Sequence, residues 1–283
     1  MCPFIPPLAD PIFKKVFADS HNLAPLRSFL SSVLDVPQDD LVDLTLLPTH
    51  LTQSHAADKE GIVDVRVRTK SGRDIDIEVQ RFREPGFRQR LVYYGARMLS
   101  GQLHSGEQYQ DMAQAIVIAI ADFPVTSCPI GQFHHRFRLH DKSHNLDLSD
   151  IMEIDVLELP KLTHTTDDTL LYKWLRFFTA RNREELDMAA TLDPEIANAV
   201  DTVHFFSEEE SAQILELRHE MAMHDRASWE WAARNPELAA KELSDDVEHI
   251  TRVSIARGLI AKGIDPDMIT DVTGVPVEEL RKY

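Results

Sequence analysis

The segment GIVDVRVR (residues 61–68), followed after a short turn by DIDIEVQ (residues 74–80), decides how this chain folds. In both segments aliphatic residues alternate with polar ones, which is the pattern of strands that bury one face. The alternation predicts a β-hairpin whose aliphatic side chains all lie on one side. The other side then carries Asp64 on the first strand and Asp76, Glu78 and Gln80 on the second. This stretch therefore predicts a hairpin with an acidic face.

The turn between the two strands decides which acids face each other. Because a slip of one residue would reverse every side chain, a hairpin with both aliphatic rows on one side needs a loop of odd length. A three-residue loop at residues 70–72, with its glycine in the left-handed conformation, places Asp64 opposite Glu78. A five-residue loop at residues 70–74 places Asp64 opposite Gln80. Either pairing brings two carboxylates within about 5 to 8 Å of each other.

Two carboxylates held this close repel each other unless positive charge lies nearby. A divalent cation would supply that charge, and oxygen ligands suit Mg²⁺, or alternatively Mn²⁺ or Ca²⁺. The other interpretation is an edge hairpin with a solvated polar face, on which Arg66, Arg68 and Arg73 neutralise the acids. The pattern alone leaves both interpretations open.

The elements around the hairpin follow from the spacing of apolar residues and from Pro and Gly. We expect helices near residues 10–19, 22–34 and 87–103. The apolar run AIVIAIA at residues 115–121 predicts a fully buried central strand. Two further strands near residues 131–140 and 150–159 extend the sheet. This order predicts an α/β fold in which helices cover both faces of a mixed sheet.

After Pro160 the pattern becomes helical. We expect helices at residues 170–180, 184–190, 194–206, 208–233 and 236–261. Ser207 and the three glutamates after it resemble a capping box that begins the fourth of these helices. The sequence therefore predicts an α/β domain over residues 1–160 and an acidic, all-helical region over residues 161–283. The second region could brace the first, bind a partner or form a homo-oligomer interface.

The net charge of −17 is unevenly distributed, which bears on what the chain binds. Residues 1–145 hold 16 Lys and Arg against 17 Asp and Glu, whereas residues 146–283 hold 14 against 30. Because phosphate binding needs Lys and Arg, we expect a nucleic acid to contact the first half. The candidate DNA-binding residues are Arg66, Arg81, Arg83, Arg88 and Arg90, and an ordinary solvated surface is the alternative.

Cysteine content and hydropathy indicate the compartment. Only Cys2 and Cys128 are present, which excludes a disulfide framework and favours a reducing, cytoplasmic environment. The sequence contains no signal peptide and no apolar run of the roughly 20 residues that a membrane span requires. We therefore expect no contact with a membrane.

Several short motifs occur in a characteristic order along the first half of the chain. They are DPIFKKVF (10–17), Asp64 with Glu-x-Gln (78–80), RLVYY (90–94), GQL (101–103), GEQY (106–109) and the apolar run from residue 115. In this order they resemble the Rpn family of recombination-promoting nucleases, often labelled putative transposases, within the PD-(D/E)xK nuclease superfamily. The resemblance implies a restriction-endonuclease-like core.

The resemblance also implies roles for individual residues. Asp64 and Glu78 would bind a divalent metal that activates water for hydrolysis of a DNA phosphodiester. Gln80 stands where the superfamily has Lys, so it can orient water through its amide but supplies no charge. A neighbouring cation such as Arg66, Arg81 or Lys14 would then substitute, or the metal would carry more of the work and turnover would be slow.

Asp10 resembles an acid that family members contribute from the first helix as an additional metal ligand. It could equally cap that helix, with Pro11 at the first helical position. The function that we expect is a metal-dependent DNA endonuclease with a role in recombination or transposition. The alternative is a catalytically weak DNA-binding or assembly protein that retains the nuclease fold.

Overall fold

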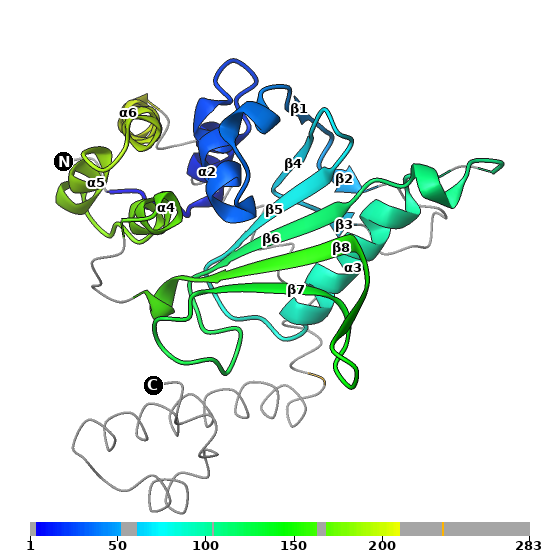
Figure 1. Cartoon of the computed structure of the whole chain (residues 1–283). Coiled ribbons are helices and arrows are strands. Elements are labelled where there is room, and N and C mark those ends of the chain that lie inside the picture. The colour runs from blue at the N-terminus through cyan, green and yellow to red at the C-terminus, as the bar shows by residue number, and fades with distance from the viewer. Residues whose placement is uncertain (1–3, 52–60, 104, 163–167, 210–233, 235–283) are drawn as a thin grey trace, which may run out of the picture.

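The computed structural model describes residues 4–51, 61–103, 105–162, 168–209 and 234. Its centre is a six-stranded mixed sheet in the order β1-β4-β5-β6-β8-β7 (Figure 1). The six strands are β1 (Thr45–Leu46), β4 (Val65–Arg68), β5 (Asp74–Gln80), β6 (Ala115–Ala121), β7 (His134–Asp141) and β8 (Leu146–Glu158). A separate two-stranded sheet pairs β2 (His50–Leu51) with β3 (Gly61–Ile62). The predicted mixed sheet and its buried central strand β6 are confirmed.

The central strands β5, β6 and β8 run parallel, whereas β1, β4 and β7 are antiparallel to their neighbours. The carboxyl ends of the parallel strands therefore meet at one edge of the sheet, here called the carboxyl edge. The register places Gln80 beside Ala121 and Ala121 beside Glu158 at this edge.

Helices cover both faces of the sheet, as predicted (Figure 1). One face packs against α3 (Phe87–Ser100), with Leu91 and Met98 directed into the core. The helical layer on the other face contains α1 (Asp10–Phe17), α2 (Ala24–Leu34), α4 (Leu170–Phe178), α5 (Arg183–Ala190) and α6 (Pro194–Glu209). Short 3-10 helices lie at Gln38–Leu41, Tyr109–Asp111 and Leu159–Lys161.

The described part of the acidic region shares its core with the N-terminal helices. Trp174 is fully buried, lies 5.6 Å from the Phe17 ring, and donates a hydrogen bond to the Ser28 hydroxyl at 3.1 Å. The Phe178 ring lies 5.4 Å from that of Phe29. Helices α4 to α6 therefore brace the sheet and α1–α2.

One predicted helix boundary is wrong. Helix α6 runs from Pro194 to Glu209 and so continues through Ser207, where the capping-box pattern predicted a new helix. The apolar residues Ile196, Val200 and Val203 hold α6 on the core. The later predicted helices, from residue 210 onward, lie outside the described residues. Within the described ranges, no helix has the length and apolarity to cross a membrane.

Candidate active site

The hairpin register brings Asp64 opposite Glu78. Strands β4 and β5 pair Val65 with Ile77 and Arg68 with Asp74, which fixes the three-residue loop and makes the five-residue alternative wrong. Gly72 closes the turn with φ of 89°, a conformation that favours glycine.

Main-chain donors hold both acids of this pair. The Asp64 N–H donates to Glu78 Oε1 at 3.2 Å, and the Val79 N–H donates to Asp64 Oδ2 at 2.9 Å. These reciprocal hydrogen bonds fix each carboxylate against the opposite strand.

The polar face of the hairpin is buried against α3 and is not solvated. Asp74 and Asp76 are 0% exposed and Glu78 is 5% exposed, so the solvated-edge interpretation is wrong for these acids. Arg66 does neutralise Asp74, since its Nε and Nη2 donate to that carboxylate at 2.9 and 2.6 Å. Helix α3 approaches closely at Gly95, where a Cβ would lie 3.2 Å from the sulfur of Met152.

Asp10 does not cap its helix, contrary to the capping interpretation. Ala9 is the N-cap residue of α1, and Asp10 occupies the first turn without a side-chain capping bond. The Lys14 ammonium lies 2.9 Å from Asp10 Oδ1 and 3.6 Å from Asp64 Oδ1. Among the described residues, no donor makes a hydrogen bond of good geometry to the two buried Asp10 oxygens. Asp10 is thus directed toward the acids of the hairpin.

The acids are short of positive charge. Burial raises the pKa of Asp64 to about 7, and the nearby Asp10 charge adds to the rise, against the lowering by Lys14. Burial, and then repulsion from Asp64, hold the pKa of Glu78 well above its usual range. Burial lowers the pKa of Lys14, but the charges of Asp64 and Asp10 outweigh it and leave this pKa raised. A further cation at this position would be stabilised.

Asp76 lies deeper than the other acids. Burial, and then the charges of Glu78 and Asp64, hold its pKa well above its usual range. Its two oxygens have no hydrogen-bond partner among the described residues. Asp76 therefore lies beneath the site as a buried carboxyl group without a hydrogen-bonding partner within the described ranges.

The donor set of Asp10, Asp64 and Glu78 fits a hard divalent cation. Carboxylate oxygens are the ligands that Mg²⁺, Mn²⁺ and Ca²⁺ prefer. Lys14 already places positive charge between two of the three. Within the described ranges, no three His, Cys, Asp or Glu side chains are grouped as metal ligands. The argument that a divalent cation fits here therefore rests on two properties of these carboxylates: they are oxygen ligands, and they repel one another without a cation.

The amide of Gln80 contacts other side chains of the site. Its Nε2 donates to Glu84 Oε1 and to the Phe82 carbonyl, both at 3.0 Å. Its Oε1 accepts a hydrogen bond from Arg90 Nη2, and Arg90 Nη1 donates to Glu84 Oε2 at 3.1 Å. Sequence reasoning named Gln80 and Arg90 but missed Glu84, which is only 4% exposed.

The structure gives the five candidate arginines different surroundings. The guanidinium of Arg66 is engaged by Asp74, and that of Arg88 donates to the Val125 carbonyl. Arg90 belongs to the Gln80–Glu84 group described above. Arg81 and Arg83 are half-buried and flank Phe82, which is 67% exposed and lies 5.6 Å from the Arg81 guanidinium carbon. Only this last pair lies beside an exposed aromatic ring.

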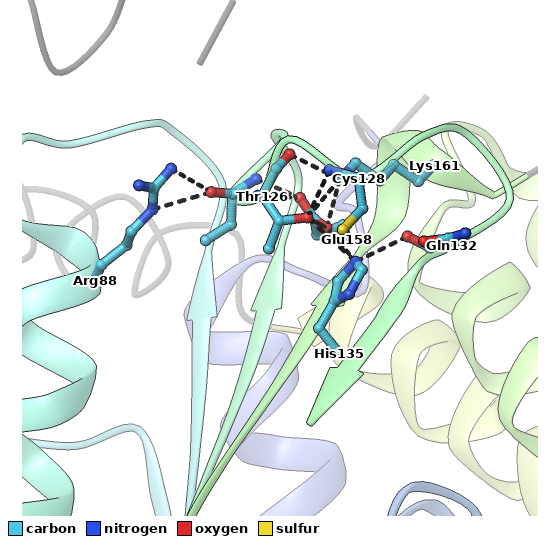
Figure 2. A network of polar contacts seen from close by, with 8 residues as sticks. Arg88, Thr126, Cys128, Gln132, His135, Glu158 and Lys161 are labelled. Carbon is cyan, nitrogen blue, oxygen red and sulfur yellow. Dashed lines mark hydrogen bonds and ion pairs between the residues drawn. The ribbon is translucent and has the colours of Figure 1, made fainter. Parts of the chain in front are cut away.

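A second polar cluster lies at the carboxyl edge, around Glu158 (Figure 2). Glu158 is fully buried and accepts hydrogen bonds from the Val125 and Thr126 N–H groups and from Lys161 Nζ at 2.7 Å. The pKa of Glu158 falls to about 2, because hydrogen bonds from His135, Lys161 and Thr126 outweigh burial, which alone would raise it. Since Arg88 holds the Val125 carbonyl, this cluster fixes the beginning of α3.

The sheet is mixed, helices cover both of its faces, and the paired acids Asp64 and Glu78 lie on the β4–β5 hairpin. This arrangement is that of the PD-(D/E)xK nuclease fold. The family model described as PD-(D/E)XK nuclease family transposase matches residues 7–233, and the chain belongs to this family. The match extends past residue 160 and includes α4 to α6. Searches of curated proteins and of solved structures each gave no match.

Proposed function

We propose that this protein is a divalent-metal-dependent DNA endonuclease that hydrolyses phosphodiester bonds. The observation that carries the proposal is the pairing of Asp64 with Glu78, both with raised pKa values, beside Lys14, which also contacts Asp10 from the first helix. Carboxylates pressed together in this way are characteristic of functional sites. Membership of a nuclease family supplies the reaction class.

In this proposal Asp64 and Glu78 hold Mg²⁺, or Mn²⁺ or Ca²⁺ in its place, and Asp10 is an additional ligand. When bound, the cation supplies Lewis acidity toward the phosphoryl oxygens and toward a nearby water. The main-chain donors of Asp64 and Val79 keep the two carboxylates in place before the metal arrives. Lys14 lies between Asp10 and Asp64 and balances their charge while the metal is absent.

Metal loading and proton release are coupled in this site. Asp64 must lose its proton to bind a cation, and its pKa of about 7 lies inside the physiological range. The affinity for metal should therefore rise with pH through neutrality.

We place the DNA along the segment after β5 and the beginning of α3. Arg81 and Arg83 are the principal phosphate contacts, and the exposed ring of Phe82 between them can pack on sugar or base. Arg88 and Arg90 add positive charge behind them. Arg66 contributes least to DNA binding, because its charge is neutralised by the ion pair with Asp74.

The finer parts of the proposal concern context. Two cysteines in 283 residues fit a reducing cytoplasm, and a role in recombination or transposition fits the family. The acidic residues after α6 are candidates for a homo-oligomer interface. The alternative function is a catalytically weak DNA-binding or assembly protein, which the engagement of the Gln80 amide favours, because both its Nε2 and its Oε1 are hydrogen-bonded to other side chains.

Incubation of the purified full chain with supercoiled plasmid and Mg²⁺, Mn²⁺ or Ca²⁺ tests the proposal. We expect nicking that depends on metal and is abolished in Asp64→Ala and in Glu78→Ala, because each change removes a ligand. Circular dichroism checks that both variants fold. Nicking at the wild-type rate by either folded variant would sink the assignment, and absence of nicking by the wild type with every metal would favour the alternative.

A further inference from the structure

Gln80, Glu84 and Arg90 form a closed group beside the acids. We propose that Arg90 supplies the fixed positive charge of this site toward the scissile phosphate, with Gln80 and Glu84 as positioning residues that hold its guanidinium. This inference rests on the proposed nuclease function and adds to it the residue that compensates for the neutral side chain at position 80.

Each member of the group contacts the other two. Arg90 Nη2 donates to Gln80 Oε1, Arg90 Nη1 donates to Glu84 Oε2 at 3.1 Å, and Gln80 Nε2 donates to Glu84 Oε1 at 3.0 Å. Gln80 ends β5, and Arg90 lies in the first turn of α3. Because a guanidinium with two directed hydrogen bonds loses most of its freedom, its charge is fixed in position.

The guanidinium faces the acids, and its two hydrogen bonds to Gln80 and Glu84 leave other N–H donors unused. The Nε–H of Arg90 is buried and has no acceptor within the described ranges. Burial lowers the pKa of Arg90, but Glu78, the strongest opposing charge, outweighs it together with Tyr94 and Glu84. Reciprocally, the Arg90 charge is the largest influence that lowers the pKa of Glu78. A quarter of the Arg90 side chain remains exposed, so an incoming anion can reach it.

The other cations near the site are engaged differently. Arg66 is turned to Asp74, at the opposite end of β5 from Gln80. Lys14 pairs with Asp10 and Asp64 themselves, where a metal would compete with it, and its flexible side chain is 38% exposed. Arg88 is directed to the Val125 carbonyl. Among Arg66, Lys14, Arg88 and Arg90, Arg90 is therefore the cation that can keep its place beside Glu78 while a metal binds.

The chemistry of this group is electrostatic. An arginine does not deprotonate in a protein, so Arg90 cannot take a proton from water. It can donate hydrogen bonds to phosphoryl oxygens as negative charge develops on them, and a preorganised donor of this kind contributes about 10²- to 10³-fold in rate. A neutral side chain at position 80 fits this role, because the Gln80 amide accepts a hydrogen bond from Arg90, whereas a lysine there would repel the guanidinium.

The test compares four forms of the full chain: wild type, Arg90→Gln, the double variant Gln80→Lys with Arg90→Gln, and Arg97→Gln. Arg97→Gln is the matched control, because it removes the same charge from α3 about two turns further along. Plasmid nicking is measured with the metal that supports it. Binding to a labelled duplex is followed by anisotropy without metal, and circular dichroism checks each fold.

We expect Arg90→Gln to reduce nicking about 10²- to 10³-fold, with a fall of at most about one in the slope of log affinity against log salt. The double variant should recover at least about tenfold, because a lysine on β5 restores a cation without Arg90 to repel it. Arg97→Gln should nick at the wild-type rate. A role of Arg90 in packing alone would give no such recovery.

A carboxyl-carbon NMR titration, with Glu78 assigned by its loss in Glu78→Gln, gives a readout independent of activity. Removal of a neighbouring positive charge should raise the pKa of Glu78 in Arg90→Gln and leave it in place in Arg97→Gln. Nicking by Arg90→Gln within about threefold of the wild type, or an unchanged Glu78 titration, would overturn the inference while leaving the nuclease proposal intact. A wild type without activity would instead overturn the nuclease proposal.

Discussion

Replacement of Asp64 by Asn should stabilise the metal-free protein at pH 8 and have a much smaller effect near pH 4.5. Asparagine keeps the shape of the side chain and can still accept the hydrogen bond from the Val79 N–H. It removes only the charge that burial and Asp10 oppose. The change therefore isolates the electrostatic strain of the site from its packing.

The sign and size follow from linkage between protonation and folding. The pKa of Asp64 is 3.8 in an ordinary environment and about 7 in the folded protein, so the folded state holds the proton more tightly. The stabilisation of the folded state by this tighter proton binding is complete below pH 3.8 and is lost as the pH rises through about 7. At about 1.4 kcal/mol for each pH unit, the difference gives a ceiling of about 4 kcal/mol at pH 8 and about 1 kcal/mol at pH 4.5.

The measured difference in the free energy of unfolding between Asp64→Asn and the wild type should lie below this upper limit. The Asp64 side chain is 20% exposed, and Lys14 loses one of its two partners in the variant. We therefore expect Asp64→Asn to raise the free energy of unfolding by about 2 to 4 kcal/mol at pH 8.

Urea unfolding in EDTA, followed by circular dichroism at pH 4.5, 6, 7 and 8, measures this gap. Asp201→Asn, at an exposed position on α6, is the matched control, and its effect should stay within about 0.5 kcal/mol at every pH. A gap that does not change with pH, or a variant less stable than the wild type at pH 8, would refute the strained site.

Three further predictions concern other parts of the molecule. Lys161→Met leaves the Glu158 carboxylate buried without its ammonium partner and should lower the free energy of unfolding by about 3 to 5 kcal/mol, measured by urea unfolding. A chain that ends at residue 160 loses the aromatic side chains of α4 from the core and should be insoluble or lack a cooperative thermal transition by circular dichroism; a stable, cooperative fragment would contradict the shared core. The double variant Arg81→Glu with Arg83→Glu should weaken duplex binding for all sequences and flatten its salt dependence, whereas an unchanged salt slope would move the DNA elsewhere.

The parts of the fold that depend on local pattern were predictable from the sequence. Alternation over residues 65–80, together with the glycine of the turn, predicted the hairpin and left two registers open, of which the structure has the one with Asp64 opposite Glu78. The predicted first strand is shorter than expected, because residues 61–62 form β3 and pair with β2. The apolar run at residues 115–121 predicted the central strand, since a strand covered on both faces needs no polar residue.

The features that the sequence could not supply depend on how separate segments pack together or on irregular chain without a repeating pattern. Asp10 followed by proline has the pattern of a cap, yet Ala9 is the N-cap residue and the Asp10 carboxylate pairs with Lys14 one turn along α1; only the packing of the hairpin brings Asp64 within 3.6 Å of the same ammonium. Ser207 has a capping pattern as well, but packing of α6 on the core continues the helix past it, at a small cost in helix propensity. Glu84 lies in irregular chain before α3, and Arg90 lies six residues later in the first turn of that helix. No helical or strand periodicity joins the two positions, so the sequence pattern does not predict their contact.

The shared core of α1, α2 and α4 to α6 has a consequence for synthesis of the protein on the ribosome. Asp10, Asp64 and Glu78 have all been translated by residue 78, but the aromatic residues that close the core against α1 follow almost a hundred residues later. A nascent chain that carries the ligands therefore cannot yet hold α1 and the hairpin together. Under the proposed function, cutting activity should begin only when translation of the helical layer is complete.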